Sequence, residues 1–186
     1  MMHKRQEGAN RKDQGFTLVE LLVVIAIIGI LVAIMIPGVG LARLAARQNR
    51  ARVEANSVKS ALVAYKNEYN RFPLQNNASG DQHTYSDSEY EDLIAILLGD
   101  NLRENGRDQN PREQVFLSTQ GGSDVDANEF LDPWDRRYNV IVDWNFDEVI
   151  NVQGHKLRTP AAVWSGGSNG TYNDDDRGRD KDLKTW

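Results

Sequence analysis

The longest apolar stretch of the chain runs from Phe16 to Ile36 and contains one ionisable residue, Glu20. As an α-helix rising 1.5 Å per residue it would extend about 31 Å, close to the ~30 Å hydrocarbon core of a bilayer. The pattern therefore predicts a helix at residues 16–36 that can cross a membrane once. A carboxylate within such a segment costs roughly 2.5–3.5 kcal/mol at the membrane centre, so we expect Glu20 to have a cationic partner.

The polar and apolar pattern after this stretch predicts that the helix continues over residues 37–70 as an amphipathic segment. Pro37 cannot donate a hydrogen bond to the carbonyl of Ala33, and two glycines follow, so we expect a kink or local melting between Ala33 and Gly40. The predicted apolar stripe comprises Ala51, Ala55, Val58, Leu62, Tyr65 and Tyr69, and the opposite face carries Arg47, Arg50, Glu54 and Lys59.

Residues 71–186 read as a small globular domain that follows this helix. Pro73 predicts the helix end, because the residue before a proline avoids the α region. A Ser-x-x-Glu signature at Ser88 and Glu91 predicts a second helix that reaches Leu98 and ends at Gly99. Short strands are predicted at 115–117, at 138–144 with one face buried, at 149–152 and at 161–164, with turns at 147–148 and 154–156. The predicted fold class is α+β, a long helix packed on a small antiparallel sheet.

Residues 1–15 are polar and basic and lack the apolar core of a secretory signal. A cut after Gly15 would instead keep the apolar segment and create a new α-amine on Phe16. On a neighbouring copy of the chain, that amine is the natural counter-charge for Glu20. The alternative is a single-pass anchor in which the glutamate is incidental.

These residues resemble the start of type IV pilin-like proteins with a class III prepilin leader. The resemblance rests on Gly15, Phe16, Thr17, Leu18, Glu20 and Pro37. It implies that a prepilin peptidase removes residues 1–15 and methylates the amine of Phe16. It also implies an inner-membrane helix at 16–36, with Glu20 and Pro37 serving assembly, and a periplasmic domain at 71–186. The pilin fold that it implies agrees with the predicted α+β class.

Two further stretches resemble the major pseudopilin of type II secretion systems. One is Leu131-Asp132-Pro133-Trp134 followed by Tyr138, although the intervening Asp135-Arg136-Arg137 departs from the family pattern. The other is the tail, with Ser165–Gly170, then Asp180-Lys181-Asp182-Leu183 and the terminal Trp186. In that family the tail forms a calcium-binding loop, so the resemblance implies a C-terminal metal-binding loop here.

The acidic tail also favours a metal site on chemical grounds, because Ca²⁺ takes six to eight hard oxygen ligands. Five aspartates lie between residues 174 and 182, and a bound dication would offset their mutual repulsion. Asp180 and Asp182 are the first candidate ligands, followed by Asp174, Asp176 and Asn169. The alternative is a solvated tail of mixed charge, because arginines and lysines alternate with the acids.

Charge and cysteine content narrow the function classes further. The chain of 186 residues has a net charge of −5, and removal of the leader would leave −7, which argues against a nucleic-acid partner. The chain contains no cysteine. Small exported domains usually need a disulfide or another stabilising link. We therefore expect a link other than a disulfide here, and a bound calcium ion is the candidate.

The sequence offers little for catalysis, and we expect no enzymatic activity. It contains none of the common hydrolase, zinc-protease or phosphate-loop motifs, and His83 and His155 are expected at the surface. We therefore predict a structural filament subunit similar to the major pseudopilin. The expected partners are further copies of itself in a helical polymer, minor pseudopilins, the inner-membrane assembly platform and the prepilin peptidase. The alternatives are a type IV pilus subunit for adhesion or DNA uptake, and a membrane-tethered carbohydrate-binding module that uses the tryptophans.

Overall fold

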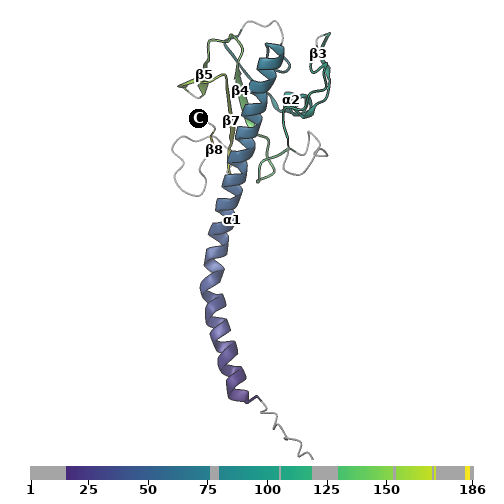
Figure 1. Ribbon diagram of the computed structural model, residues 1–186. Coiled ribbons are helices and arrows are strands. Elements are labelled where there is room, and N and C mark those ends of the chain that lie inside the picture. Colours follow the sequence, from purple (N-terminus) through teal and green to yellow (C-terminus); the bar gives the residue numbers. More distant parts are fainter. Residues whose placement is uncertain are drawn as a thin grey trace, which may run out of the picture. The chain divides into compact units, whose positions relative to one another are not determined.

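The computed structural model describes residues 16–75, 80–104, 106–118, 130–152, 154–168, 170 and 183–184, with the backbone alone for 34–38 and 183–184. The chain divides into two compact units, Met1–Arg43 and Leu44–Trp186, which are described separately. Helix α1 (Leu18–Tyr69) supplies most of the described first unit and also opens the second (Figure 1). The leader, residues 1–15, lies outside the described residues.

In the first unit, α1 is helical without a break, including at Pro37. Of the predicted kink or local melting between Ala33 and Gly40, the melting is therefore wrong, and the kink stays a prediction. A proline removes only its own bond to the carbonyl four residues earlier, and the turns on both sides, rich in alanine, leucine and isoleucine, continue the helix.

In the second unit, the predicted apolar stripe of α1 forms one wall of the core. Ala51, Ala55, Val58, Leu62 and Tyr65 are buried, which confirms the helical spacing read from the sequence. The helix ends at Tyr69 as predicted, because Asn70 takes a left-handed conformation (φ 55°) that stops the helix before Pro73.

The sheet of the second unit has four antiparallel strands in the order β1-β4-β7-β8 (Figure 1). These strands are β1 (Gln82–Thr84), β4 (Asn139–Asp143), β7 (Ala161–Ser165) and β8 (Leu183–Lys184). Two small hairpins accompany it, β2 (Arg103–Glu104) with β3 (Arg107–Asp108) and β5 (Val149–Val152) with β6 (His155–Arg158). The α+β prediction is confirmed.

Both faces of the central strands β4 and β7 are covered. Val140, Val142 and Val163 face the core that contains α1 and α2 (Asp87–Leu98). Ile141, Ala162 and Trp164 form a second cluster with residues of the β5–β6 hairpin, namely Ile150, Val152 and Leu157. The strand predicted at 138–144 is therefore confirmed, but the prediction of a single buried face is wrong, because the hairpin folds over the other face.

Helix α2 ends at Gly99 as predicted but begins with a different cap. Glu89 accepts hydrogen bonds from the backbone N–H (2.8 Å) and the hydroxyl (2.7 Å) of Ser86, so Ser86 replaces the predicted Ser88. The predicted partner Glu91 instead forms an ion pair with Arg137. Burial alone would raise the pKa of Glu89, but the two hydrogen bonds from Ser86 and the nearby His83 lower it.

Two local predictions in the sheet region are wrong. Residues 115–117 form no strand, because the N–H groups of Phe116 and Leu117 both donate to the carbonyl of Leu97 at the end of α2. The turn predicted at 154–156 is limited to Gly154, whose φ of 88° allows β6 to begin directly at His155.

A fully buried asparagine, Asn110, connects three parts of the second unit. Its Oδ1 accepts hydrogen bonds from the Tyr69 hydroxyl (2.7 Å) and the Gln114 N–H (3.0 Å). Its Nδ2 donates to the carbonyls of Ile96 (3.2 Å) and Gln114 (2.9 Å). The side chain thus joins the end of α1, the end of α2 and the loop that follows β3.

Asn110→Leu is expected to lower the free energy of unfolding of the second unit by about 3 kcal/mol, because the Tyr69 hydroxyl and the Gln114 N–H would lose their acceptor within the protein. Urea denaturation of residues 44–186 measures the change. Asn67→Ala, on the exposed side of α1, is the control and should change stability by less than about 0.5 kcal/mol. Equal effects of the two substitutions would contradict the structural role of Asn110.

Candidate assembly, processing and tail sites

The N-terminus of α1 brings Thr17 and Glu20 together in a capping box. Glu20 Oε2 accepts hydrogen bonds from the Thr17 backbone N–H (2.9 Å) and hydroxyl (2.7 Å), and Thr17 Oγ1 accepts the Glu20 N–H (3.3 Å). Both side chains are exposed, so the carboxylate can still accept donors from another chain. The pairing of Glu20 with a neighbouring Phe16 amine stays a prediction, and Gly15 lies outside the described residues.

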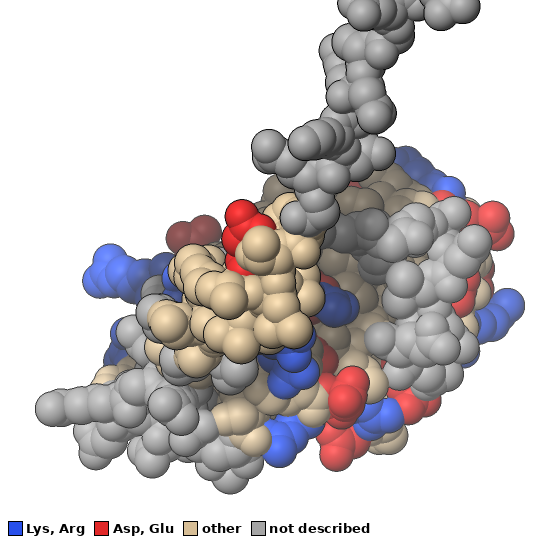
Figure 2. All heavy atoms as spheres, turned by 90° about the horizontal axis from the view of Figure 1, so that it is seen from below, with Lys and Arg blue, Asp and Glu red and all other residues tan. Residues whose placement is uncertain are grey.

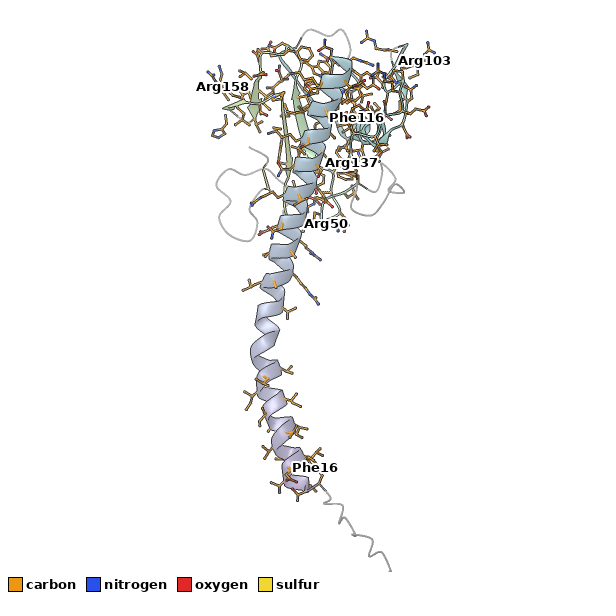
Figure 3. All side chains as sticks on the ribbon, in the orientation of Figure 1. Phe16, Arg50, Arg103, Phe116, Arg137 and Arg158 are labelled. Atoms are coloured by element: carbon orange, nitrogen blue, oxygen red, sulfur yellow. The ribbon has the colours of Figure 1, made fainter. Side chains whose placement is uncertain are left out.

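The first part of α1 is apolar around its whole circumference. Every described side chain from Phe16 to Ala33 is exposed, and Figure 3 shows these side chains projecting on all sides of the helix below Arg50. Among the helices that the described residues form, none combines the length and the apolar character that a membrane-spanning segment requires. The side chain of Pro37 is not among those described.

Some of the charged residues predicted opposite the apolar stripe of α1 form ion pairs or hydrogen bonds. Arg50 Nε lies 2.8 Å from Glu54 Oε1, and Glu54 Oε2 accepts a hydrogen bond from the Tyr138 hydroxyl (2.6 Å). Burial and the Glu54 carboxylate raise the pKa of Tyr138, and the hydrogen bond to Glu54 raises the pKa of Arg50. Burial lowers the pKa of Lys59. Glu54 and Lys59 are half-buried, so this face of α1 is only partly solvated.

The described surface of the chain carries both signs of charge (Figure 2). On the face seen in Figure 2, acidic and basic side chains alternate over the described surface instead of forming one continuous patch. A hollow on the second unit, lined by residues 46, 47 and 50 of α1 and residues 131–133 and 135, likewise mixes two arginines with two aspartates. Such a surface does not steer a partner of a single charge sign.

The two stretches that resemble the major pseudopilin meet in the fold. Asp132, which is buried, accepts hydrogen bonds on Oδ1 from the N–H groups of Trp134 and Arg136, both at 2.9 Å. Its Oδ2 accepts the hydroxyl of Ser165 at 2.5 Å, which joins the 131–136 turn to the loop at 165–170. Asp135 takes a left-handed conformation (φ 61°), so the turn closes despite its departure from the family pattern.

The predicted metal ligands Asp174, Asp176, Asp180, Asp182 and Asn169 all lie outside the described residues. Within the described ranges, no three histidine, cysteine or acidic side chains are grouped so that they could hold a metal ion. The calcium site therefore stays a prediction. The described residues next to this acidic segment include Leu183, which pairs with Ser165 where β8 meets β7.

The described tryptophans offer no open ligand-stacking face. Trp144 and Trp164 are buried and Trp134 is partly buried, which does not favour a carbohydrate-binding module. His83, predicted at the surface, stacks on Trp144 with 4.2 Å between ring centroids, and its Nε2 lies 3.3 Å from Glu89 Oε1. That expectation was wrong, whereas His155 is exposed as expected.

Thr17 was not predicted as a partner of Glu20, although its signal is present in the sequence. Thr17-Leu18-Val19-Glu20 is a Thr-x-x-Glu capping box placed directly before an apolar run. Asn110 has no local signal in the sequence, because a polar residue in a loop is normally exposed.

Comparison with known proteins places these features in a family. Residues 10–36 match the family model described as the prokaryotic N-terminal methylation motif. The type IV major pilin protein PilE1 of Neisseria gonorrhoeae is 30% identical over 138 residues, which cover 73% of this chain and 69% of the relative. The type II secretion system core protein G of Aeromonas hydrophila is 38% identical over 63 residues, 34% of this chain and 44% of the relative. The type IV major pilin protein PilA of Myxococcus xanthus is 36% identical over 63 residues, 34% of this chain and 29% of the relative. With its leader motif, its long exposed N-terminal helix and its small antiparallel sheet, the chain belongs to the family of type IV pilins and pseudopilins.

Proposed function

We propose that this filament subunit is a major pseudopilin that works in a type II secretion system. The observation that carries the proposal is the hydrogen bond from the Ser165 hydroxyl to Asp132. It joins the two segments, 131–138 and 165–170, whose sequences resemble the major pseudopilin. The likeness to core protein G of a type II secretion system supports the same assignment. In this role the protein is a structural subunit and performs no chemistry itself.

The exposed apolar part of α1 supports a two-stage mechanism. Before assembly, residues 16–36 lie in the inner membrane, with the domain at 71–186 in the periplasm and the leader cut by a prepilin peptidase. During assembly the helix moves from lipid into a bundle of identical helices, so its apolar surface remains covered throughout. The transfer therefore costs little in apolar burial, while Glu20 gains the amine of a neighbouring Phe16. The same contact repeated head to tail without closing gives a filament.

The same mechanism requires partners besides further copies of the chain. An assembly platform in the inner membrane would extract the subunit, and minor pseudopilins would begin the filament. The peptidase is the partner with the most direct support, because residues 10–36 match the methylation motif.

A second candidate function is that of a type IV pilus subunit for adhesion or DNA uptake. One observation favours it: the likeness to a major pilin extends over 73% of this chain, whereas the likeness to core protein G covers 34%. Deletion of the gene in its own host separates the two functions. A secretion subunit predicts loss of exported enzymes from the medium with surface pili retained. Loss of pili and twitching with normal export would instead establish the pilus function.

Glu20→Ala is expected to reduce filament yield at least tenfold, because the Phe16 amine loses its counter-charge, while insertion of the monomer improves. Glu20→Asp should give an intermediate yield, since aspartate keeps the charge on a shorter side chain. Glu113→Ala, which removes an exposed acid of the second unit, is the matched control and should assemble normally. The measurement is the amount of subunit in sheared filament fractions. A wild-type yield from Glu20→Ala would rule out the pairing.

A further inference from the structure

The loop at 165–170 is closed on itself by hydrogen bonds between its own residues. The Gly170 N–H donates to the Gly166 carbonyl (3.0 Å), and the Gly167 N–H donates to Ser165 Oγ (3.0 Å). The backbones approach so closely that a Cβ on Gly166 would lie 2.8 Å from the carbonyl carbon of Gly170. Gly167 (φ 62°) and Gly170 (φ 74°) also take conformations that disfavour side chains.

Arg136 reaches this loop from the neighbouring turn. Its backbone is held at both ends, because its N–H donates to Asp132 Oδ1 (2.9 Å) and its carbonyl accepts the Asp132 N–H (2.7 Å). From this fixed position its Nη1 donates to the Gly167 carbonyl at 3.0 Å. The guanidinium also occupies the space beside Gly170, since a Cβ there would overlap it.

The next residue, Arg137, contacts helix α2 instead of the loop at 165–170. Its guanidinium pairs with Glu91, donates to the Asp87 carbonyl and lies 5.9 Å from the centre of the Tyr90 ring. All of these partners belong to α2. Two consecutive arginines therefore hold different elements, which makes Arg137 a matched control for Arg136.

We propose that Arg136 is a positioning residue that holds the loop at 165–170 closed without a metal ion. Its planar guanidinium keeps the Gly167 carbonyl in place and fills the gap beside Gly170. The resulting clamp, with Asp132 and Ser165, acts as the staple that a small exported domain without cysteine needs.

Hydrogen exchange of the mature, full-length chain in detergent micelles tests the proposal. With a chelator present, Arg136→Ala should speed exchange of the Gly167 and Gly170 amides at least tenfold and leave α2 unchanged. Arg137→Ala should show the reverse pattern. Arg136→Lys should restore part of the protection, because lysine can donate to the Gly167 carbonyl but cannot fill the same space. Wild-type protection of the loop in Arg136→Ala would overturn the proposal.

A double-mutant cycle with Gly170→Ala tests the contact itself. The added methyl group should displace the guanidinium, so Gly170→Ala alone should open the loop about as far as Arg136→Ala does. In the Arg136→Ala background the same substitution should have a much smaller effect, because only the backbone strain remains. Strictly additive effects would mean that the two groups do not touch and would overturn the proposal.

Calcium provides the arm that separates the role of Arg136 from the predicted calcium site. If the tail binds calcium, saturating calcium should restore loop protection in Arg136→Ala. If calcium changes exchange in no variant, the calcium site fails. The loss of protection in Arg136→Ala under chelator would still support the role of Arg136.

Discussion

Gly15→Arg is expected to leave the leader attached and to abolish filament formation. The peptidase must place the bond between residues 15 and 16 in its site, and a long charged side chain should block that placement. The uncut chain has no free amine on Phe16, so Glu20 keeps only its own Thr17 as a partner. Four basic residues of the leader would also remain at the end of the apolar helix, where their burial in a filament core is costly.

Co-expression with a prepilin peptidase and mass spectrometry of the N-terminus measure this effect. The wild-type chain should begin with N-methyl-Phe16, and Gly15→Ala should retain part of the cleavage because alanine is small. Gly8→Arg, which adds the same charge elsewhere in the leader, is the control and should be processed. An intact Met1 in the wild-type chain, or a cut at another bond, would reject the leader assignment.

Calcium is expected to stabilise the second unit, residues 44–186, by roughly 2.7 kcal/mol when its concentration is a hundred times its dissociation constant. For a unit of this size that corresponds to a rise in Tm of about 10 °C. Asp180→Ala combined with Asp182→Ala should abolish the rise, and a chelator should reproduce the loss in the wild type. Magnesium should substitute poorly, because it demands tight octahedral geometry and gives up its water reluctantly.

Differential scanning calorimetry of metal-stripped protein provides the measurement and its control. Without metal, the double variant should be at least as stable as the wild type, because two mutually repelling carboxylates are gone. A Tm of the wild type that calcium does not change would favour the alternative interpretation of the tail as a solvated charged segment.

Local patterns of the sequence determined the long helix and three of the strands, β4, β5 and β7. The spacing of Ala51, Ala55, Val58 and Leu62 predicted the buried stripe, and the left-handed Asn70 before Pro73 agrees with the predicted helix end. The leader motif could be read from residues 15–20 alone. Each of these features depends on interactions within about one helical turn or along one strand, so the sequence carries the whole signal.

Tertiary contacts decided the features that local patterns left open or predicted wrongly. Two Ser-x-x-Glu boxes compete at the start of α2, and Ser86 becomes the cap because Arg137, distant in sequence, takes Glu91. The second buried face of β4 depends on the β5–β6 hairpin folding over Ile141. Asn110 is buried because four hydrogen bonds, with Tyr69, Ile96 and Gln114, satisfy its amide.

The candidate tail site likewise depends partly on local sequence and partly on tertiary structure. The acids and glycines that predict a cation site are visible in the sequence, but the clamp between Asp132, Arg136 and the loop at 165–170 is not. About thirty residues separate the two segments, and a hydrogen bond between them depends on how β4 and β7 pair. Pairing of distant segments is set by the burial of both sheet faces, a property of the whole domain that no short stretch of sequence contains.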